Sequence, residues 1–239
     1  MALMKVCDLC KSYPGFALQE ISFALDAGSI TGFIGRNGAG KTTTIKSMLN
    51  LVHPDSGEIT YFGLPLVGNE AAIKARLGYS TGAVSFYPKK KLGELLKISS
   101  SFYPNWDDAA CKHYLSLFAL DTEKTVSALS DGMKVKVNLL LALSHKAEVL
   151  ILDEPTSALD PFSRDELLEI FMDLRGEGVS ILFSTHIISD IEKCADHVLY
   201  IQKGKLLTNG SIEAFRRDVS LPDETVEETM LRLERSGRS

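Results

Sequence analysis

One short segment, GRNGAGKT at residues 35–42, limits the fold more than any other part of this 239-residue chain. It follows the apolar run SITGFIG (29–35), which has the composition of a buried strand. It precedes KTTTIKSMLNLV (41–52), whose apolar residues recur with helical spacing until Pro54 and Gly57 stop the helix. A strand, a glycine-rich loop and a helix in succession are typical of an α/β fold. Further buried strands that alternate with helices, EVLILDE, VSILFSTH and DHVLYIQ, predict a largely parallel sheet.

The same segment has the chemistry of a phosphate-binding loop, because it matches the pattern GxxxxGK[ST] between a strand and a helix. Its glycines let several backbone N–H groups point inward, and the next helix adds its positive end. We expect Lys41 to reach the β- and γ-phosphates of a nucleoside triphosphate, and Thr42 to ligate Mg²⁺. A glycine-rich turn with an exposed lysine is the alternative. The expected nucleotide-binding residues of the loop are Gly35, Arg36, Asn37, Gly38, Ala39, Gly40, Lys41, Thr42 and Thr43.

A second candidate element is VLILDE (149–154), an apolar strand that ends in two adjacent carboxylates. Ligands of open α/β sheets bind beyond the carboxyl ends of the strands, so we expect Asp153 to lie near Lys41 and to hold Mg²⁺. Glu154 is expected to polarise an attacking water. His186 ends another apolar strand and should reach the same edge. A solvated turn or helix cap is the alternative for the carboxylates, and a structural role is the alternative for the histidine.

The rest of the chain alternates strands and helices around one mostly helical stretch, residues 88–146. We expect its aromatic residues to form the core of a small helical subdomain rather than a ligand cage; they are Phe86, Tyr87, Phe102, Tyr103 and Trp106. The predicted parts of the chain are N-terminal strands with the nucleotide-binding core (1–82), a helical subdomain (83–147), a second part of the core (148–220) and a short C-terminal tail (221–239).

Composition and charge exclude several classes of protein. The formal net charge of -5 and the absence of a basic cluster argue against nucleic-acid binding. A membrane span needs about 20 apolar residues in a row, and no such run occurs, so we expect a soluble, cytoplasmic chain. Cys7 and Cys10 form a single CxxC without a second ligand pair; two strand residues in a reducing compartment are favoured over a zinc or redox site.

Taken in order, these motifs resemble those of the ATP-binding subunit of an ABC transporter over nearly the whole chain. GRNGAGKT is similar to the Walker A motif, LSDGM (129–133) to the signature, VLILDE to Walker B, SALD (157–160) to the D-loop and His186 to the switch histidine. The resemblance implies an ABC-type P-loop NTPase fold, with an antiparallel β subdomain and an inserted helical subdomain. It also implies hydrolysis of MgATP through Glu154 while His186 holds the γ-phosphate.

The resemblance also implies partners. Ser130 and Gly132 at a helix N-terminus would bind the γ-phosphate of ATP held by a second ATPase subunit, identical or different. The pair would drive a separate integral-membrane permease, at the inner face of the cell membrane. Tyr13 matches the adenine-stacking aromatic, with a strand-end tyrosine as the alternative. SFYPNWDD and LSDGMKVK are similar to segments of bacterial multidrug, bacitracin and acetoin-utilisation exporters.

Two departures from the family pattern motivate an alternative function. The usual LSGGQ is LSDGM here, with Asp131 near an anionic ligand or acting as a helix cap and Met133 in place of glutamine. Gly82 stands where relatives carry a glutamine that senses Mg²⁺ and couples to the membrane subunit. The alternative is a nucleotide-gated regulatory protein with slow turnover. A soluble ABC ATPase acting on DNA or ribosomes would need coiled coils, tandem cassettes or a basic patch, and a GTPase would need NKxD; the sequence has none of these.

Overall fold

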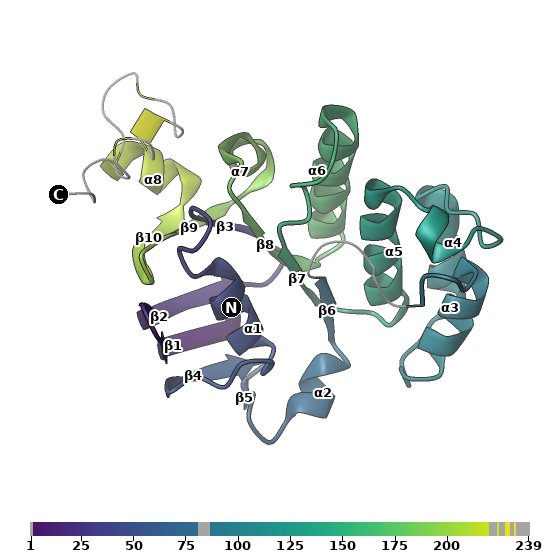
Figure 1. Cartoon of the computed structure of the whole chain (residues 1–239), viewed down its shortest axis with the longest axis horizontal. Helices are drawn as coiled ribbons and strands as arrows, with labels where there is room; N and C mark the ends of the chain where they lie inside the picture. The colour runs from purple at the N-terminus through teal and green to yellow at the C-terminus, as the bar shows by residue number, and fades with distance from the viewer. Residues whose placement is uncertain (1, 81–86, 220–223, 225–227, 230–231, 233–239) are drawn as a thin grey trace.

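The computed structural model describes residues 2–80, 87–219, 224, 228–229 and 232. This part of the chain folds into two sheets and a group of helices (Figure 1). The first sheet is antiparallel and has the order β2-β1-β4-β5. Its strands are β1 (Ala2–Tyr13), β2 (Phe16–Asp26), β4 (Ser56–Tyr61) and β5 (Leu64–Pro65). The antiparallel β subdomain implied by the family resemblance is therefore confirmed.

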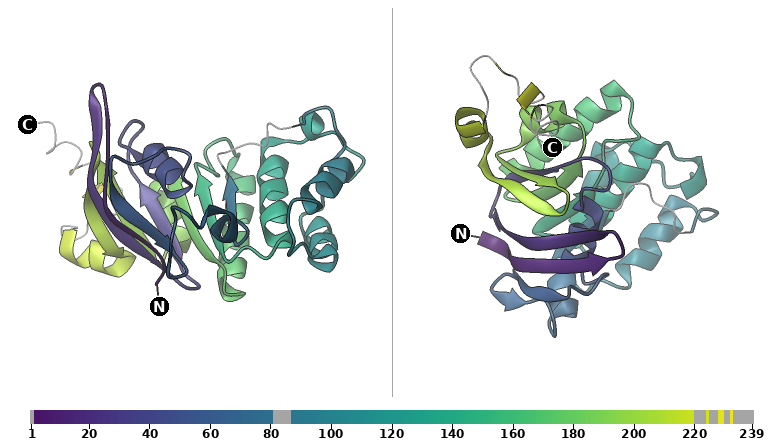
Figure 2. Two further views of the ribbon diagram at one scale, coloured as in Figure 1. Left: turned by 90° about the horizontal axis from the view of Figure 1, so that it is seen from below. Right: turned by 60° about the vertical axis from the view of Figure 1, so that its left-hand side comes forward.

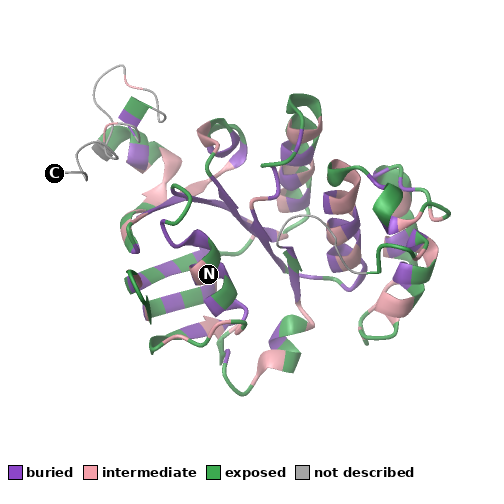
Figure 3. Cartoon of the chain, in the orientation of Figure 1, coloured by how far each residue is buried: buried purple, intermediate pink, exposed green. Residues whose placement is uncertain are grey.

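The second sheet has six strands in the order β10-β9-β3-β8-β7-β6, and its neighbours are parallel except for the β10–β9 pair. The strands are β3 (Ile30–Ile34), β6 (Leu77–Ser80), β7 (Val149–Asp153), β8 (Ser180–Thr185), β9 (His197–Gln202) and β10 (Lys205–Ser211). Every residue of β3, β7 and β8 is buried, because both faces of the sheet centre are covered (Figure 3). The predicted largely parallel sheet is thus confirmed.

Helices cover this sheet and extend beyond its β6 edge. They are α1 (Lys41–Met48), α2 (Glu70–Lys74), α3 (Leu92–Ser100), α4 (Asp108–Leu117), α5 (Asp131–Ser144), α6 (Pro161–Gly176), α7 (Ile188–Cys194) and α8 (Ile212–Val219), with a 3-10 turn at Val126–Ala128. Figure 2 shows α3, α4 and α5 grouped at one end of the molecule, away from the antiparallel sheet. This group is the expected helical insertion. No helix in the described ranges is long and apolar enough to cross a membrane.

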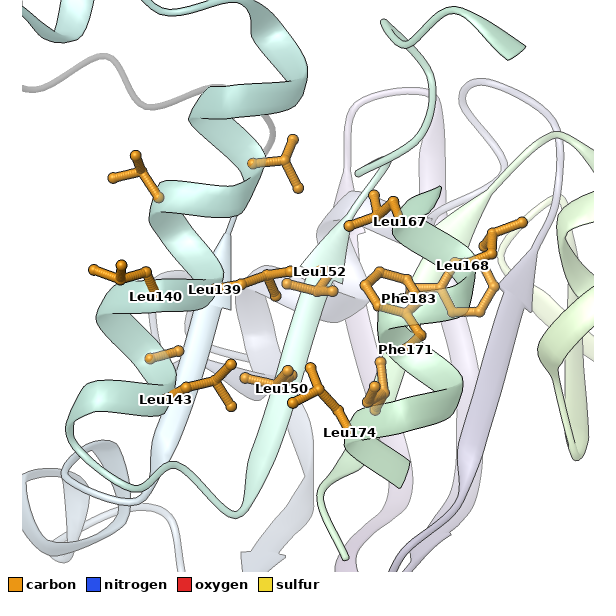
Figure 4. Close-up of a cluster of buried hydrophobic side chains, with 14 of the residues drawn as sticks. Leu139, Leu140, Leu143, Leu150, Leu152, Leu167, Leu168, Phe171, Leu174 and Phe183 are labelled. Atoms are coloured by element: carbon orange, nitrogen blue, oxygen red, sulfur yellow. The ribbon is translucent and has the colours of Figure 1, made fainter. Parts of the chain in front are cut away.

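The two faces of the parallel sheet belong to two hydrophobic cores. Alternate residues of a strand point to opposite faces, so Leu150 and Leu152 of β7 join one core while Val149 and Ile151 join the other. Figure 4 shows the first core, where leucines of α5 and side chains of α6 meet β7 and Phe183. The second core lies between the sheet, α1 and the antiparallel sheet. Both cores hold the strand ends that carry the candidate site in fixed positions.

The structure corrects two expectations about the middle of the chain. Strand β6 was not predicted, because its sequence LGYS is short and lacks an apolar run; Gly78 allows it to pack closely against Ala142 of α5. The prediction that the aromatic residues form the core of the helical subdomain was only partly right. Trp106 packs against the main core, whereas Phe102 is 74% exposed and Tyr87 is also exposed. Phe86 and Gly82 lie outside the described residues.

The predicted division at 147/148 falls between α5 and β7, and the divisions at 82/83 and 220/221 lie outside the described residues. The four-part division of the chain remains a prediction.

Candidate functional site

The glycine-rich loop joins β3 to α1 beyond the carboxyl end of β3. Gly40 has a φ of 120°, and a Cβ built there would lie 2.7 Å from Leu18 and 3.0 Å from Phe16, so only glycine fits. Lys41 is buried, and its Nζ donates to the carbonyl oxygen of Gly35 at 2.6 Å. The lysine therefore folds back over the loop it follows.

Three oxygen-bearing side chains meet at the strand ends beside the loop. The Thr42 hydroxyl donates to Oδ2 of Asp153 at 2.9 Å, which joins the start of α1 to the end of β7. The Ser184 hydroxyl donates to Oδ1 of Asp153 at 2.6 Å, from the end of the neighbouring strand β8. Hydroxyl and carboxylate oxygens are the ligands that Mg²⁺ prefers, and Mg²⁺ commonly takes only one or two from the protein. The structure thus places the predicted pair Thr42 and Asp153 together.

Glu154 is the centre of the charge arrangement. Its Oε1 lies 3.1 Å from Nζ of Lys41, and its Oε2 lies 2.9 Å from Nδ1 of His186. The first contact is an ion pair without hydrogen-bond alignment, since Oε1 is buried and accepts no hydrogen bond within the described part of the chain. The backbone N–H of Glu154 donates to the Ser184 hydroxyl at 2.9 Å, and the φ of Glu154 is 52°. A non-glycine residue in this conformation needs its surroundings to hold it there.

A cleft of about 600 Å³ lies over the loop. Its lining residues are Gly15, Phe16, Arg36, Asn37, Gly38, Gly40, Lys41, Thr42, Thr43 and Glu154. A second hollow of about 530 Å³ is lined by Arg36–Ala39 on one side and by His186, Gln202 and Lys203 on the other. The structure therefore brings together the loop, both carboxylates and the histidine that the sequence predicted.

Among the described residues that line the cleft, the aromatic one is Phe16, and Tyr13 is not in this lining. Phe16 lines the cleft and approaches Gly40. Tyr13 ends β1, is 42% exposed, and its ring lies 5.7 Å from Nζ of Lys11. Sequence reasoning did not consider Phe16, although it stands only three residues after Tyr13 in the same hairpin. The role assigned to Tyr13 remains a prediction.

Ser184 is the other residue that the sequence analysis did not assign a role. It is fully buried and contacts both Asp153 and the backbone of Glu154. Its signal in the sequence is a polar residue in an apolar strand, two positions before His186. The pairing of β7 with β8 sets Asp153 opposite Ser184, and this register cannot be read from either strand alone.

The segment LSDGM lies at a different place. Ser130 is the N-cap of α5 and accepts from the N–H of Met133 at 3.3 Å, so the suggested capping role of Asp131 is wrong. Asp131 instead forms an ion pair with Lys134 at 2.8 Å. Ser130 and Gly132 line a hollow of about 110 Å³ with residues of α6. None of its lining residues is shared with the cleft over Lys41.

The segment SALD connects the two places. Asp160 at its end caps α6, accepting from the N–H groups of Phe162 and Ser163 at 3.0 and 3.1 Å. The Ser163 hydroxyl also donates to this carboxylate, and these hydrogen bonds lower the pKa of Asp160. Ser163 lines the hollow at Ser130, so the α6 start lies beside the LSDGM segment.

Comparison with known proteins shows which family this chain resembles in sequence and structure. Residues 18–157 match a family model described as ABC transporter. The chain is 38% identical over 209 residues to the bacitracin transport ATP-binding protein BcrA of Bacillus licheniformis, covering 86% of this chain and 68% of that protein. It is 33% identical over 227 residues to the probable multidrug ABC transporter ATP-binding protein YbhF of Escherichia coli, covering 92% of this chain but 39% of that protein. A solved ATP-binding subunit of an ABC transporter superimposes with a TM-score of 0.86 at 29% identity, covering 97% of this chain and 99% of that chain.

Proposed function

The chain belongs to the ABC transporter family as an ATP-binding subunit, and from this premise we propose that it binds MgATP in the cleft over Lys41 and hydrolyses it to drive a separate membrane permease. One observation carries the proposal: both carboxylate oxygens of Glu154 are in contact with the groups expected to hold the γ-phosphate, Lys41 and His186. A general base must lie within hydrogen-bond reach of the water it activates, and the contacts of Glu154 with Lys41 and His186 support it in this role.

The loop and its lysine supply the binding of the phosphates. A bound γ-phosphate competes with Glu154 for the Lys41 ammonium, because both are anions within its reach. Release of Oε1 from Lys41 leaves Glu154 able to accept a proton from water as the water attacks the γ-phosphorus and the bond to ADP breaks. His186 contacts the other oxygen of Glu154 and can hold the phosphate oxygen on that side.

Thr42 and Asp153 fit a magnesium ion, since their oxygen atoms meet 2.9 Å apart and are of the hard type that this ion takes. These two residues would hold the ion beside the phosphates. When bound, Mg²⁺ neutralises charge on the phosphate oxygens.

We further propose that the active unit is a dimer of ATPase subunits, identical or different. The hollow at Ser130 and Gly132 shares no lining residue with the cleft over Lys41, so within one described chain the two do not form a common site. A helix N-terminus with free N–H groups favours an anion, and a second chain can present its γ-phosphate there. Two chains related by a twofold axis then complete two equal sites.

A complementation assay tests the dimer. Lys41→Ala removes phosphate binding and Ser130→Phe blocks the hollow, so each variant alone should be inactive. In an equal mixture half of the dimers are mixed, and each mixed dimer keeps one intact site, so turnover should recover to about one quarter of the wild-type value. A Ser130→Phe chain that keeps wild-type turnover would remove LSDGM from the site.

The permease is expected to dock beside β6. A hollow of about 290 Å³ lies there, lined largely by apolar and aromatic residues such as Leu51, Tyr79, Tyr103 and Leu141. Leu51 and Tyr79 are exposed, and apolar side chains at a surface hollow are typical of a protein interface. This contact would place the chain in the cytoplasm, peripheral at the inner face of the cell membrane. The names of the two relatives support bacitracin-like compounds or a range of drugs as the transported substrates.

The rate of ATP turnover by the purified chain, with Mg²⁺ and with a chelator, tests the proposed reaction. We expect robust turnover that requires the ion. Slow turnover with tight nucleotide binding would instead support the regulatory alternative, for which the Asp131 carboxylate at the LSDGM helix start is the structural argument.

A further inference from the structure

A buried carboxylate behind His186 has no part in the mechanism described above. Asp190 lies in the first turn of α7 and is 1% exposed. Its Oδ2 accepts from the hydroxyl of Thr156 at 2.6 Å and from the hydroxyl of Thr185 at 3.5 Å. Both threonines are fully buried. A carboxylate away from water is costly unless hydrogen bonds satisfy it, so its presence here calls for a function.

The two threonines belong to the two loops that carry the hydrolytic residues. Thr156 follows Glu154 by two positions after β7, and Thr185 directly precedes His186 at the end of β8. Asp190 therefore bridges the same two loops that the Glu154–His186 contact of 2.9 Å bridges. Ser184 joins these loops on the side of the strand ends, and Asp190 joins them on the side of α7.

Each loop is closed tightly around its threonine. On one side, the N–H and hydroxyl of Ser157 both donate to the carbonyl oxygen of Glu154, so Thr156 sits inside a short turn. On the other side, the Thr185 hydroxyl also accepts from the N–H of Ile187, which holds His186 between two fixed neighbours. A displacement of either threonine would therefore move the catalytic residue of its loop.

Glu154 depends on such support because its backbone has a φ of 52°. This conformation costs free energy and persists only where the surrounding structure enforces it. The hydrogen bond from Thr156 to a charged carboxylate is of the stronger kind, and its length of 2.6 Å is typical of that class. Burial raises the pKa of Asp190, and the Thr156 hydroxyl opposes this by stabilising the charged form.

We propose that Asp190 is a positioning residue for ATP hydrolysis, which holds the Glu154 and His186 loops in register through Thr156 and Thr185. The proposal rests on the proposed function, because it takes Glu154 and His186 as the hydrolytic pair. Asp190 is not among the described residues that line the nucleotide cleft, so it acts through the two loops that its hydrogen bonds join.

The test compares steady-state ATP turnover of Asp190→Asn, Thr156→Val and their double variant. Asp190→Asn removes the charge and Thr156→Val removes the hydroxyl of this hydrogen bond, so each single variant should lower kcat by about tenfold, while KM for ATP stays within about twofold. The double variant should be no slower than about twofold below the singles, because asparagine removes the charge and valine removes the hydroxyl of the same hydrogen bond. Thr156→Ser keeps the hydroxyl and should restore kcat to near the wild-type value.

The matched control is Glu192→Gln on the same helix, whose carboxylate pairs with Arg216 at the surface. Its kcat should equal that of wild type. Thermal unfolding of every variant shows which chains are folded, and Thr156→Val keeps the test valid if Asp190→Asn does not fold.

The proposal is overturned if the folded variants lose thermal stability or ATP affinity but keep wild-type kcat, since Asp190 would then be purely structural. Failure of the proposed function looks different: the wild-type chain would not hydrolyse ATP, or Glu154→Gln would hydrolyse it as fast as wild type.

Discussion

Replacing Ser184 with alanine is the perturbation that best tests how the site is held together. The Ser184 hydroxyl donates to Asp153 and accepts from the N–H of Glu154, and the residue is fully buried. A hydrogen bond to a charged group contributes about 1.5–3 kcal/mol, and an unsatisfied buried N–H costs about 1–3 kcal/mol. The two free-energy costs are not fully additive, because the surrounding structure relaxes around the missing hydroxyl. We therefore expect the free energy of unfolding to fall by about 2–4 kcal/mol.

Turnover should fall as well, because Glu154 loses one of the contacts that fix its backbone. We expect a decrease of about tenfold or more in kcat. Urea denaturation gives the stability and steady-state hydrolysis gives the rate. Ser101→Ala is the control, since its exposed hydroxyl donates to a backbone carbonyl oxygen at the end of α3, in the helical insertion. A Ser184→Ala chain whose stability changes by less than about 0.5 kcal/mol, with wild-type turnover, would refute this reasoning.

Three further predictions follow from single contacts. Gly40→Ala places a Cβ 2.7 Å from Leu18 at a φ of 120°, so the affinity for ATP, measured by calorimetry, should fall by about tenfold or more. Gly176→Ala is the control, because its Cβ meets open space, and it should leave the affinity unchanged. Asp131→Gly removes the ion pair with Lys134 and should alter turnover by the dimer without changing ATP affinity of a single chain; a change in affinity alone would argue against a site shared between chains. The pKa of Asp160 is lowered, so its contribution to stability is complete above the ordinary value of 3.8 and is lost as the pH falls through the lowered pKa. Asp160→Asn should therefore reduce the melting temperature at neutral pH but not in strong acid. An equal reduction at both pH values would contradict the cap.

The features that could be predicted from sequence are those with a local signal. GRNGAGKT predicts a phosphate-binding loop, and VLILDE predicts a buried strand with carboxylates at its end. The rule that ligands bind at the carboxyl ends of parallel strands was then enough to bring Lys41, Asp153 and Glu154 together. These contacts are present in the structure.

The features that could not be predicted depend on register and on packing between distant segments. Ser184 lies opposite Asp153 only because β8 pairs with β7 in one register. Strand β6 forms because Gly78 fits against α5, which a window of four residues does not reveal. The contact between Asp190 and Thr156 joins residues 34 positions apart through a helix turn. Such contacts carry the positioning of the site, and they are visible only in three dimensions.

Single-turnover hydrolysis of MgATP by wild-type and Glu154→Gln chains tests the central claim most directly. The variant keeps the shape of the side chain and its reach to Lys41 and His186, but it cannot accept a proton from water at neutral pH. The account predicts that the variant binds ATP about as tightly as wild type and hydrolyses it at least about a hundredfold more slowly. Hydrolysis by Glu154→Gln at the wild-type rate would contradict it.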